Sequence, residues 1–145
     1  MRAAEAVAFA VTAGAMEPLS AAVHRYIGHG PAWALHRSHH DGPVAGPELN
    51  DVIPAVSAAA TVALFAYGQW GRAERARLVT PIAAGATLYG VVYAVIHDLY
   101  IHRRLPLLPA RVRWLEPFRA AHEAHHRQGS GHWGILSRQR SVPPR

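Results

Sequence analysis

The sequence LVTPIAAGATLYGVVYAVIHDLYIH, residues 78–102, joins an uncharged apolar run to a pair of histidines. The run from Leu78 to Ile96 has nineteen residues, and an α-helix needs roughly 20 to cross the hydrocarbon core of a bilayer. His97 and His102 follow directly. This order predicts a membrane-spanning helix with metal-ligand side chains at its end.

Two more apolar stretches are long enough to span a membrane. One runs from Ala3 to Val23, interrupted by Glu17 and Pro18, and the other runs from Val52 to Trp70 without a charge. The alternative is a soluble bundle with buried helices, which uncharged runs of this length in so short a chain disfavour. The first stretch also has features of a signal peptide. Because it contains Glu5 and Glu17 and leads into a histidine motif, we expect it to be retained.

The composition supports the same class of protein. Half of the residues are apolar and 17% are charged, whereas soluble domains have roughly 25% charged residues. We therefore predict an all-α fold, an integral membrane helical bundle that forms one domain over residues 1–145 with a loose tail from about 128 to 145. Three transmembrane helices are expected, or four if the short apolar segment 30–35 belongs to another membrane element.

The predicted spans give the protein two sides. Residues 24–51 and 97–145 would share one side, which holds every histidine and eleven of the fifteen arginines. The positive-inside rule then predicts a multi-pass protein of the cell (inner) membrane with a cytoplasmic, histidine-rich cap. The arginines flank apolar runs and do not alternate with exposed aromatic residues, so we expect no nucleic-acid partner.

Eleven histidines among 145 residues are the most informative feature of the sequence. Histidine is the commonest metal ligand, and the absence of cysteine excludes thiolate ligation. A lone histidine is usually an ordinary surface or core residue. Here, however, an H-x4-H pair followed by an H-x2-H-H triplet occurs once before and once after the central spans, which indicates a metal centre. The ten histidines of this pattern are His24, His29, His36, His39, His40, His97, His102, His122, His125 and His126.

Helix geometry gives these spacings a meaning. Positions i, i+3 and i+4 lie on one helix face, so each triplet can direct three imidazoles to one point. Positions i and i+5 diverge on a regular helix, so the pairs are expected at helix ends, where the chain unwinds or turns. Ten imidazoles exceed the ligand number of one ion, and two ions with about five ligands each account for them. Nitrogen ligands suit iron, copper or zinc.

Four acidic residues lie beside the histidine groups. They are candidate partners of the histidines, because a metal-bound imidazole usually donates its second N–H to a carboxylate or a carbonyl. The alternative, which the sequence supports equally, is that they are solvated charges at the membrane interface. His132 has no partner at a metal-ligand spacing, and we predict that it is not a ligand. The acidic candidates are Glu48, Asp51, Asp98 and Glu123.

The motifs resemble those of the bacterial β-carotene hydroxylases, a branch of the fatty-acid hydroxylase and sterol desaturase superfamily. The resemblance extends in order over roughly residues 17–135. Departures include Gly28, where the family often has methionine, and residues 99–101, where glycine and valine are common. The matching stretches are HRYIGHG (24–30), LHRSHH (35–40), ELND (48–51), TLYG (87–90), HD (97–98), HRRLP (102–106) and AHEAHH (121–126).

The resemblance implies a non-heme di-iron monooxygenase that hydroxylates carbon 3 of the β-ionone ring. It would convert β-carotene into β-cryptoxanthin and zeaxanthin with O2 and electrons from reduced ferredoxin, ultimately from NAD(P)H. The ten histidines would hold the two iron ions. The carotenoid would enter from the bilayer, and the oligomeric state stays open, a homodimer included.

Several alternatives remain at this point. A sterol or fatty-acid hydroxylase or desaturase would use the same centre, and a histidine-rich membrane metal-binding or transport protein belongs to another class. Four arginines can dock an acidic ferredoxin or contact lipid headgroups, and we favour lipid for most of them. They are Arg25, Arg37, Arg103 and Arg104. Four aromatic residues are candidate pocket walls, although structural packing is the more usual role. They are Trp33, Phe65, Tyr89 and Tyr93.

Overall fold

The computed structural model describes residues 2–42, 46–71 and 76–137 of the chain. Two parts of the sequence-based predictions lie outside these residues. One is the end of the predicted loose tail, residues 138–145, and the other is two of the fifteen arginines, Arg72 and Arg75, which the predicted spans assign to the side without histidines.

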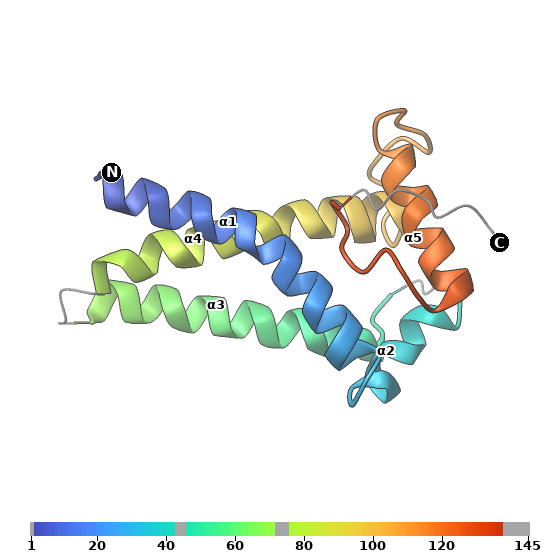
Figure 1. Ribbon diagram of the computed structural model, residues 1–145, viewed down its shortest axis with the longest axis horizontal. Helices are drawn as coiled ribbons and strands as arrows, with labels where there is room; N and C mark the ends of the chain where they lie inside the picture. The colour runs from blue at the N-terminus through green and yellow to red at the C-terminus, as the bar shows by residue number, and fades with distance from the viewer. Residues whose placement is uncertain (1, 43–45, 72–75, 138–145) are drawn as a thin grey trace.

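The described residues form helices and contain no strand, which confirms the predicted all-α class. Among the described residues the three long α-helices run along the length of the molecule, and the two shorter α-helices lie together at one end (Figure 1). In chain order the elements are α1 (Ala3–Val23), the π-helix η1 (His24–Gly28), α2 (Trp33–His40), the 3-10 helix η2 (Leu49–Asp51), α3 (Val52–Trp70), α4 (Ala76–Ala94), the π-helix η3 (Val95–Ile101) and α5 (Glu116–Gln128).

The three long helices are those expected from the apolar stretches. α1 and α3 have the predicted bounds, whereas α4 begins two residues earlier and its helical backbone continues through η3. All three are long and apolar enough to cross a membrane. Their outer surfaces suit lipid, because valines on them are more than half exposed, for example Val7, Val56 and Val91. The segment 30–35 forms a turn and the start of α2 and adds no span.

α4 lies between α1 and α3 and packs against both of them. The close approach depends on small residues. A Cβ atom at Gly85 would lie 2.6 Å from the carbonyl oxygen of Phe9 on α1. A Cβ at Gly68 on α3 would lie 3.0 Å from the backbone nitrogen of Thr80 on α4. Such glycine contacts are typical of helix pairs in membranes, where packing replaces the hydrophobic effect as the source of association.

α1 continues through Pro18 and is not interrupted there. Figure 1 shows that the helix bends along its course toward the end of the bundle that carries α2. Proline removes one backbone hydrogen bond and its ring crowds the preceding turn, which explains a bend. The bend brings the end of α1, and with it η1, to the other short helices.

The histidine motifs all lie at one end of the bundle, and the N-terminus lies at the other (Figure 1). Beneath the histidines is a small apolar core that joins η3, α5 and the segment after α5. Its buried members are Ile96, Tyr100, Leu115 and Ile135. This core holds α5 across the end of the bundle and thereby positions the second histidine triplet over the first.

Candidate metal centre

Both H-x4-H pairs lie in π-helical turns. The amide of His29 donates to the carbonyl of His24 at 2.9 Å, and the amide of His102 donates to that of His97 at 2.9 Å. In a π-helix these i to i+5 hydrogen bonds place residues five apart one above the other. The ring centroids of the two pairs are therefore 5.1 and 4.6 Å apart. The pairs converge at helix ends, as expected, and the wider helical turn is the physical reason.

Nine of the ten histidines form two groups in which one nitrogen of each imidazole lies within 4.8 Å of the others. The tenth, His126, lies between the groups, with its ring stacked on that of His40 at 4.4 Å and 4.5 Å from that of His122. The first group is His24, His29, His36, His40 and His125, and the second group is His39, His97, His102 and His122.

The H-x2-H-H triplets do not each serve one point, contrary to the sequence-based prediction. In both triplets the middle histidine crosses to the group of the other half: His39 joins His97, and His125 joins His29. Their Nε2 atoms meet at 3.0 and 3.1 Å. The reason is that positions i+3 and i+4 differ by about 100° around a helix. A triplet placed between two sites therefore divides its side chains between them.

Five imidazoles are oriented by a hydrogen bond between Nδ1 and an oxygen of a residue outside the two histidine groups. In each case the partner oxygen belongs to a carboxylate, an amide or a backbone carbonyl, so Nδ1–H is the donor. The acceptors are the carbonyl of Trp133 for His24 (2.8 Å), Asn50 Oδ1 for His36 (2.8 Å), Glu48 Oε1 for His39 (3.1 Å), Asp98 Oδ1 for His97 (2.8 Å) and the carbonyl of Gly131 for His125 (2.7 Å).

These outer hydrogen bonds show that the groups suit a metal ion. His24 and His36 both donate Nδ1–H outward, so a lone pair remains on each Nε2, and the two Nε2 atoms are 3.0 Å apart. His39 and His97 repeat the arrangement, also at 3.0 Å. Two facing lone pairs repel each other unless a cation lies beside them. A neutral imidazole whose other N–H is fixed in this way is the usual metal-ligand form.

The electrostatics favour the neutral rings. Burial, followed by the neighbouring imidazoles, lowers the pKa of His29 and of His40 to about 4 and that of His102 to about 3. The same causes lower the pKa of His126 to about 2. At neutral pH the lone pairs are therefore available without loss of a proton.

These shifts predict that the metal-free cap is acid-sensitive. The unfolded histidines titrate near 6.5 and the folded ones near 4 or below, so between these values the unfolded cap binds more protons. The free energy of unfolding should be constant above pH 6.5 and fall as the pH drops toward 4. The unfolding constant should rise about tenfold per pH unit for each extra proton. Hydrogen exchange of α2 and α5 against pH checks this, and a pH-independent exchange free energy would contradict it.

The structure places two of the four acidic candidates against histidines. Glu48 accepts from His39 and is 3% exposed, and Asp98 accepts from His97. In the described part of the chain Asp51 makes no hydrogen bond to a histidine and instead forms a two-pronged ion pair with Arg104 at 2.6 and 2.7 Å. Glu123 is exposed on α5 and makes no hydrogen bond to the ten histidines among the described residues.

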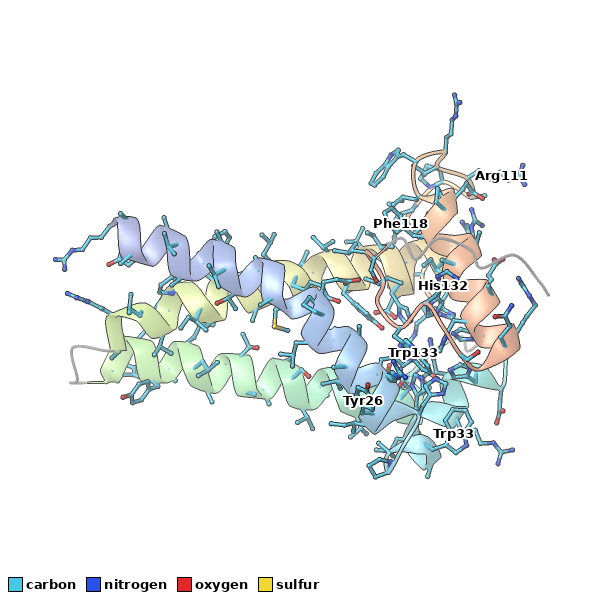
Figure 2. All side chains as sticks on the ribbon, viewed as in Figure 1. Tyr26, Trp33, Arg111, Phe118, His132 and Trp133 are labelled. Atoms are coloured by element: carbon cyan, nitrogen blue, oxygen red, sulfur yellow. The ribbon has the colours of Figure 1, made fainter. Side chains whose placement is uncertain are left out.

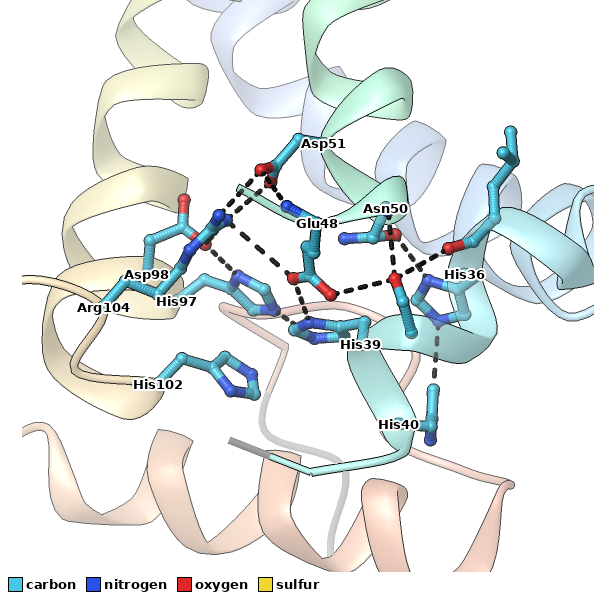
Figure 3. A network of polar contacts seen from close by, with 12 residues as sticks. His36, His39, His40, Glu48, Asn50, Asp51, His97, Asp98, His102 and Arg104 are labelled. Carbon is cyan, nitrogen blue, oxygen red and sulfur yellow. Dashed lines mark hydrogen bonds and ion pairs between the residues drawn. The ribbon is translucent and has the colours of Figure 1, made fainter. Parts of the chain in front are cut away.

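Arg104 connects these carboxylates (Figure 3). Its guanidinium lies 3.9 Å from Glu48 and 4.0 Å from Asp98 in addition to its contact with Asp51. Arg104 was expected to face lipid or a protein partner, and the structure directs it inward. Because its three carboxylates come from the segment before η2, from η2 and from η3, the arginine holds both halves of the second group in register.

Sequence reasoning missed three further contributors. Asn50 belongs to a matching motif but has no charge, so it was not a ligand-support candidate, although its place beside Asp51 was a usable signal. The carbonyl of Gly131 comes from the backbone, which no side-chain pattern reveals. Trp133 packs edge-on against His29 and His125 with ring centroids 4.9 and 5.0 Å away, at the histidine end of the bundle (Figure 2).

The segment 131–137, which carries Trp133, is fixed by a glutamate of the first apolar helix. Glu17 Oε1 accepts from the backbone amides of Leu136 and Ser137 at 2.8 and 2.7 Å, and Oε2 accepts from the hydroxyl of Tyr89 at 2.9 Å. A carboxylate in an apolar helix is costly unless it is paired or hydrogen-bonded. Here it has three donors, and it holds the segment whose carbonyls orient His24 and His125.

The aromatic residues considered as pocket walls have different surroundings. The ring of Tyr93 stacks on His97 at 4.6 Å, and Trp33 lies 5.2 Å from the ring of His29. Tyr89 reaches Glu17. Phe65 is half-buried on α3. Two of the four therefore contact the histidine groups directly.

Glu48 and Glu123 provide a matched test of the hydrogen bonds that orient the imidazoles through Nδ1. Glu48→Ala should lower metal affinity about 10–100-fold, because loss of such a partner frees the ring and the tautomer of His39. Glu123→Ala should leave the affinity unchanged, since Glu123 is exposed. Competition for the metal with a chromophoric chelator measures both. Equal behaviour of the two variants would contradict a role for Glu48.

Comparison with known proteins points to the same family that the sequence motifs resemble. No protein-family model and no solved structure matches the chain. The β-carotene hydroxylase of Pseudescherichia vulneris is 37% identical over 131 residues, which cover 84% of this chain and 70% of that protein. The β-carotene hydroxylase of Pantoea ananas is 35% identical over 132 residues, or 87% and 73%. The chloroplastic β-carotene 3-hydroxylase of an Oncidium hybrid cultivar is 41% identical over 107 residues, 71% of this chain. The chain spans about a third of that plant protein's length, 34%. At this identity and coverage of the bacterial relatives, the chain belongs to the β-carotene hydroxylase family.

Proposed function

We propose that the protein hydroxylates carbon 3 of the β-ionone ring of β-carotene, giving β-cryptoxanthin and then zeaxanthin. One observation carries this proposal: two convergent groups of neutral imidazoles lie at the end of an apolar helical bundle. The names of the relatives supply the substrate class. The bundle accounts for a substrate with no polar group, which would reach the site from the bilayer.

The proposed metals are two iron ions, one for each histidine group. The first would take the five histidines of the first group, and the second would take the four of the second group with His126 as the fifth. Bound iron would supply activation of O2, with electrons from a ferredoxin-type donor that NAD(P)H ultimately reduces. Zinc and copper accept the same ligands, so activity is a better criterion than occupancy.

The protein's own residues would set the geometry. Glu48, Asn50 and Asp98 fix imidazole rings and tautomers through Nδ1, and Arg104 lies beside two of these carboxylates and holds them in place. Burial of His39 and His125, which are 4% and 0% exposed, keeps water from the groups. These features preorganise the ligands before a substrate arrives.

We also propose a position for the protein in the cell. Of the arginines that the structure describes, eight lie in the parts at the histidine end and two, Arg2 and Arg77, lie at the other end. This asymmetry supports a protein of the inner membrane with its histidine end in the cytoplasm. That side would also present the site to a soluble electron donor.

Product analysis tests the proposal. Expression of the chain in a bacterial host that makes β-carotene should yield β-cryptoxanthin and zeaxanthin, separated by chromatography and identified by mass. His39→Ala should yield neither. Hydroxylated sterols or fatty acids without new pigment would favour the sister hydroxylases or desaturases. Tightly held zinc without O2 consumption would favour a metal-binding or transport protein, although the ligands lie at the helix ends and transporter sites usually lie near the middle of the membrane.

A further inference from the structure

The loop 103–115, between η3 and α5, exposes large apolar side chains. Leu105, Leu107 and Trp114 are 55%, 70% and 66% exposed. Isolated exposed apolar residues are ordinary on protein surfaces, but here three large ones lie within one short loop. The reaction proposed above uses none of these residues.

The exposed residues belong to an ordered loop. Its base is held by Tyr100, which is fully buried and whose hydroxyl accepts from the amide of Val112 at 3.0 Å. Arg119 donates to the carbonyl of Ala110 at 3.0 Å, and Leu115 is buried in the apolar core. The loop therefore presents its outer side chains in a fixed arrangement.

The loop lies at the edge of the apolar zone. It starts two residues after η3 ends at Ile101, the last residue of the third candidate span. Figure 1 shows that it extends sideways from this end of α4, across the long axis of the bundle. In a bilayer that surrounds the three long helices, the loop would lie along the membrane surface beside the bundle.

The charges of the loop match an anionic surface. Arg103, Arg111 and Arg113 are exposed, and residues 99–115 contain no acidic residue. The side chain of Arg111 points away from the protein (Figure 2). Tryptophan, leucine and arginine together are the side chains that enter the membrane interface, with the apolar groups at the acyl boundary and the arginines among the headgroups.

We propose that the loop 103–115 is an interfacial membrane anchor that inserts Leu105, Leu107 and Trp114 into the headgroup region of a leaflet containing anionic lipid. An acidic protein would match the arginines as well. The position of the loop beside the apolar helices, where lipid must lie, favours the membrane. The proposal depends on the membrane position of the helices and not on the reaction.

The absence of cysteine from the chain allows a direct test. Leu107→Cys, labelled with an environment-sensitive fluorophore, is compared with Gln128→Cys, an exposed and uncharged control at the end of α5. The full chain is reconstituted in phosphatidylcholine vesicles with and without phosphatidylglycerol. Quenching is measured with a nitroxide-bearing lipid and with aqueous iodide.

The label at Leu107 should be quenched by the lipid nitroxide and protected from iodide, most strongly with phosphatidylglycerol, whereas the label at Gln128 should show the reverse. Replacing Arg111 and Arg113 by glutamine should reduce the effect of phosphatidylglycerol at least about twofold. Iodide quenching at Leu107 equal to that at Gln128 in both membranes would overturn the proposal. So would protection that appears only when an acidic electron-transfer protein is added.

Discussion

The single variants His39→Ala and His125→Ala should each lose about half of the bound metal and hydroxylate at least about a hundredfold more slowly. Loss of an outer hydrogen-bond partner alone typically costs 10–100-fold, and these residues are proposed ligands. Each crosses from its own half of the chain to the group of the other half, so each loss should open a different group. Metal content of the purified variants and pigment formation in the host are the measurements.

Double variants separate this arrangement from the simpler one in which each triplet serves a single ion. His39 and His97 share a group, so their double alanine variant should lose no more metal than either single variant. The His39 and His125 double variant should lose nearly all of it. Near-complete loss of metal from the His39 and His97 double variant would refute the crossed assignment. His132→Asn is the control, because asparagine tolerates the left-handed backbone at that position, where φ is 49°, and both metals should remain.

The helical architecture follows from the sequence because apolar runs of spanning length leave few alternatives. Val52–Trp70 has the bounds expected from its uncharged run. Ala3–Val23 also has the expected bounds, because a proline such as Pro18 bends a helix without ending it when neighbouring helices support it. The end of the third helix was placed too early at Ile96 because the π-helix η3 continues it. Periodicity arguments assume 3.6 residues per turn and do not anticipate such a turn.

The residues of the candidate site were predictable, whereas the division of the histidines between the two groups was not. All ten histidines lie together, and they could be predicted because the spacing and the repetition of the two histidine motifs depend on local helix geometry. The division of the triplets depends on how α5 lies over α2, a tertiary contact set by the core of Tyr100 and Leu115. Asn50 and the carbonyls of Gly131 and Trp133 escaped prediction for a related reason. Any residue has a carbonyl, and only the fold selects which one meets an imidazole.

Glu17→Ala should lower hydroxylation about 10–100-fold, although among the described residues Glu17 makes no hydrogen bond to any of the ten histidines of the two motifs. The glutamate holds the amides of Leu136 and Ser137, and the same segment supplies the carbonyls that fix His24 and His125. Without the carboxylate, these rings lose their orientation, an effect comparable with loss of a direct hydrogen-bond partner. Pigment yield, metal affinity and hydrogen exchange of residues 131–137 are the measurements.

The defect should be confined to one metal, because His24 and His125 both belong to the first group. Glu17→Ala should weaken binding of one ion and leave the other unchanged, whereas a general loss of packing would weaken both. Glu17→Gln should restore part of the activity, since its amide oxygen can still accept from the two backbone amides. Glu5→Gln changes an acidic residue in the first turn of the same helix and should behave as the unchanged protein. Equal weakening of both metals by Glu17→Ala would show that the glutamate stabilises the bundle as a whole and does not position the first group.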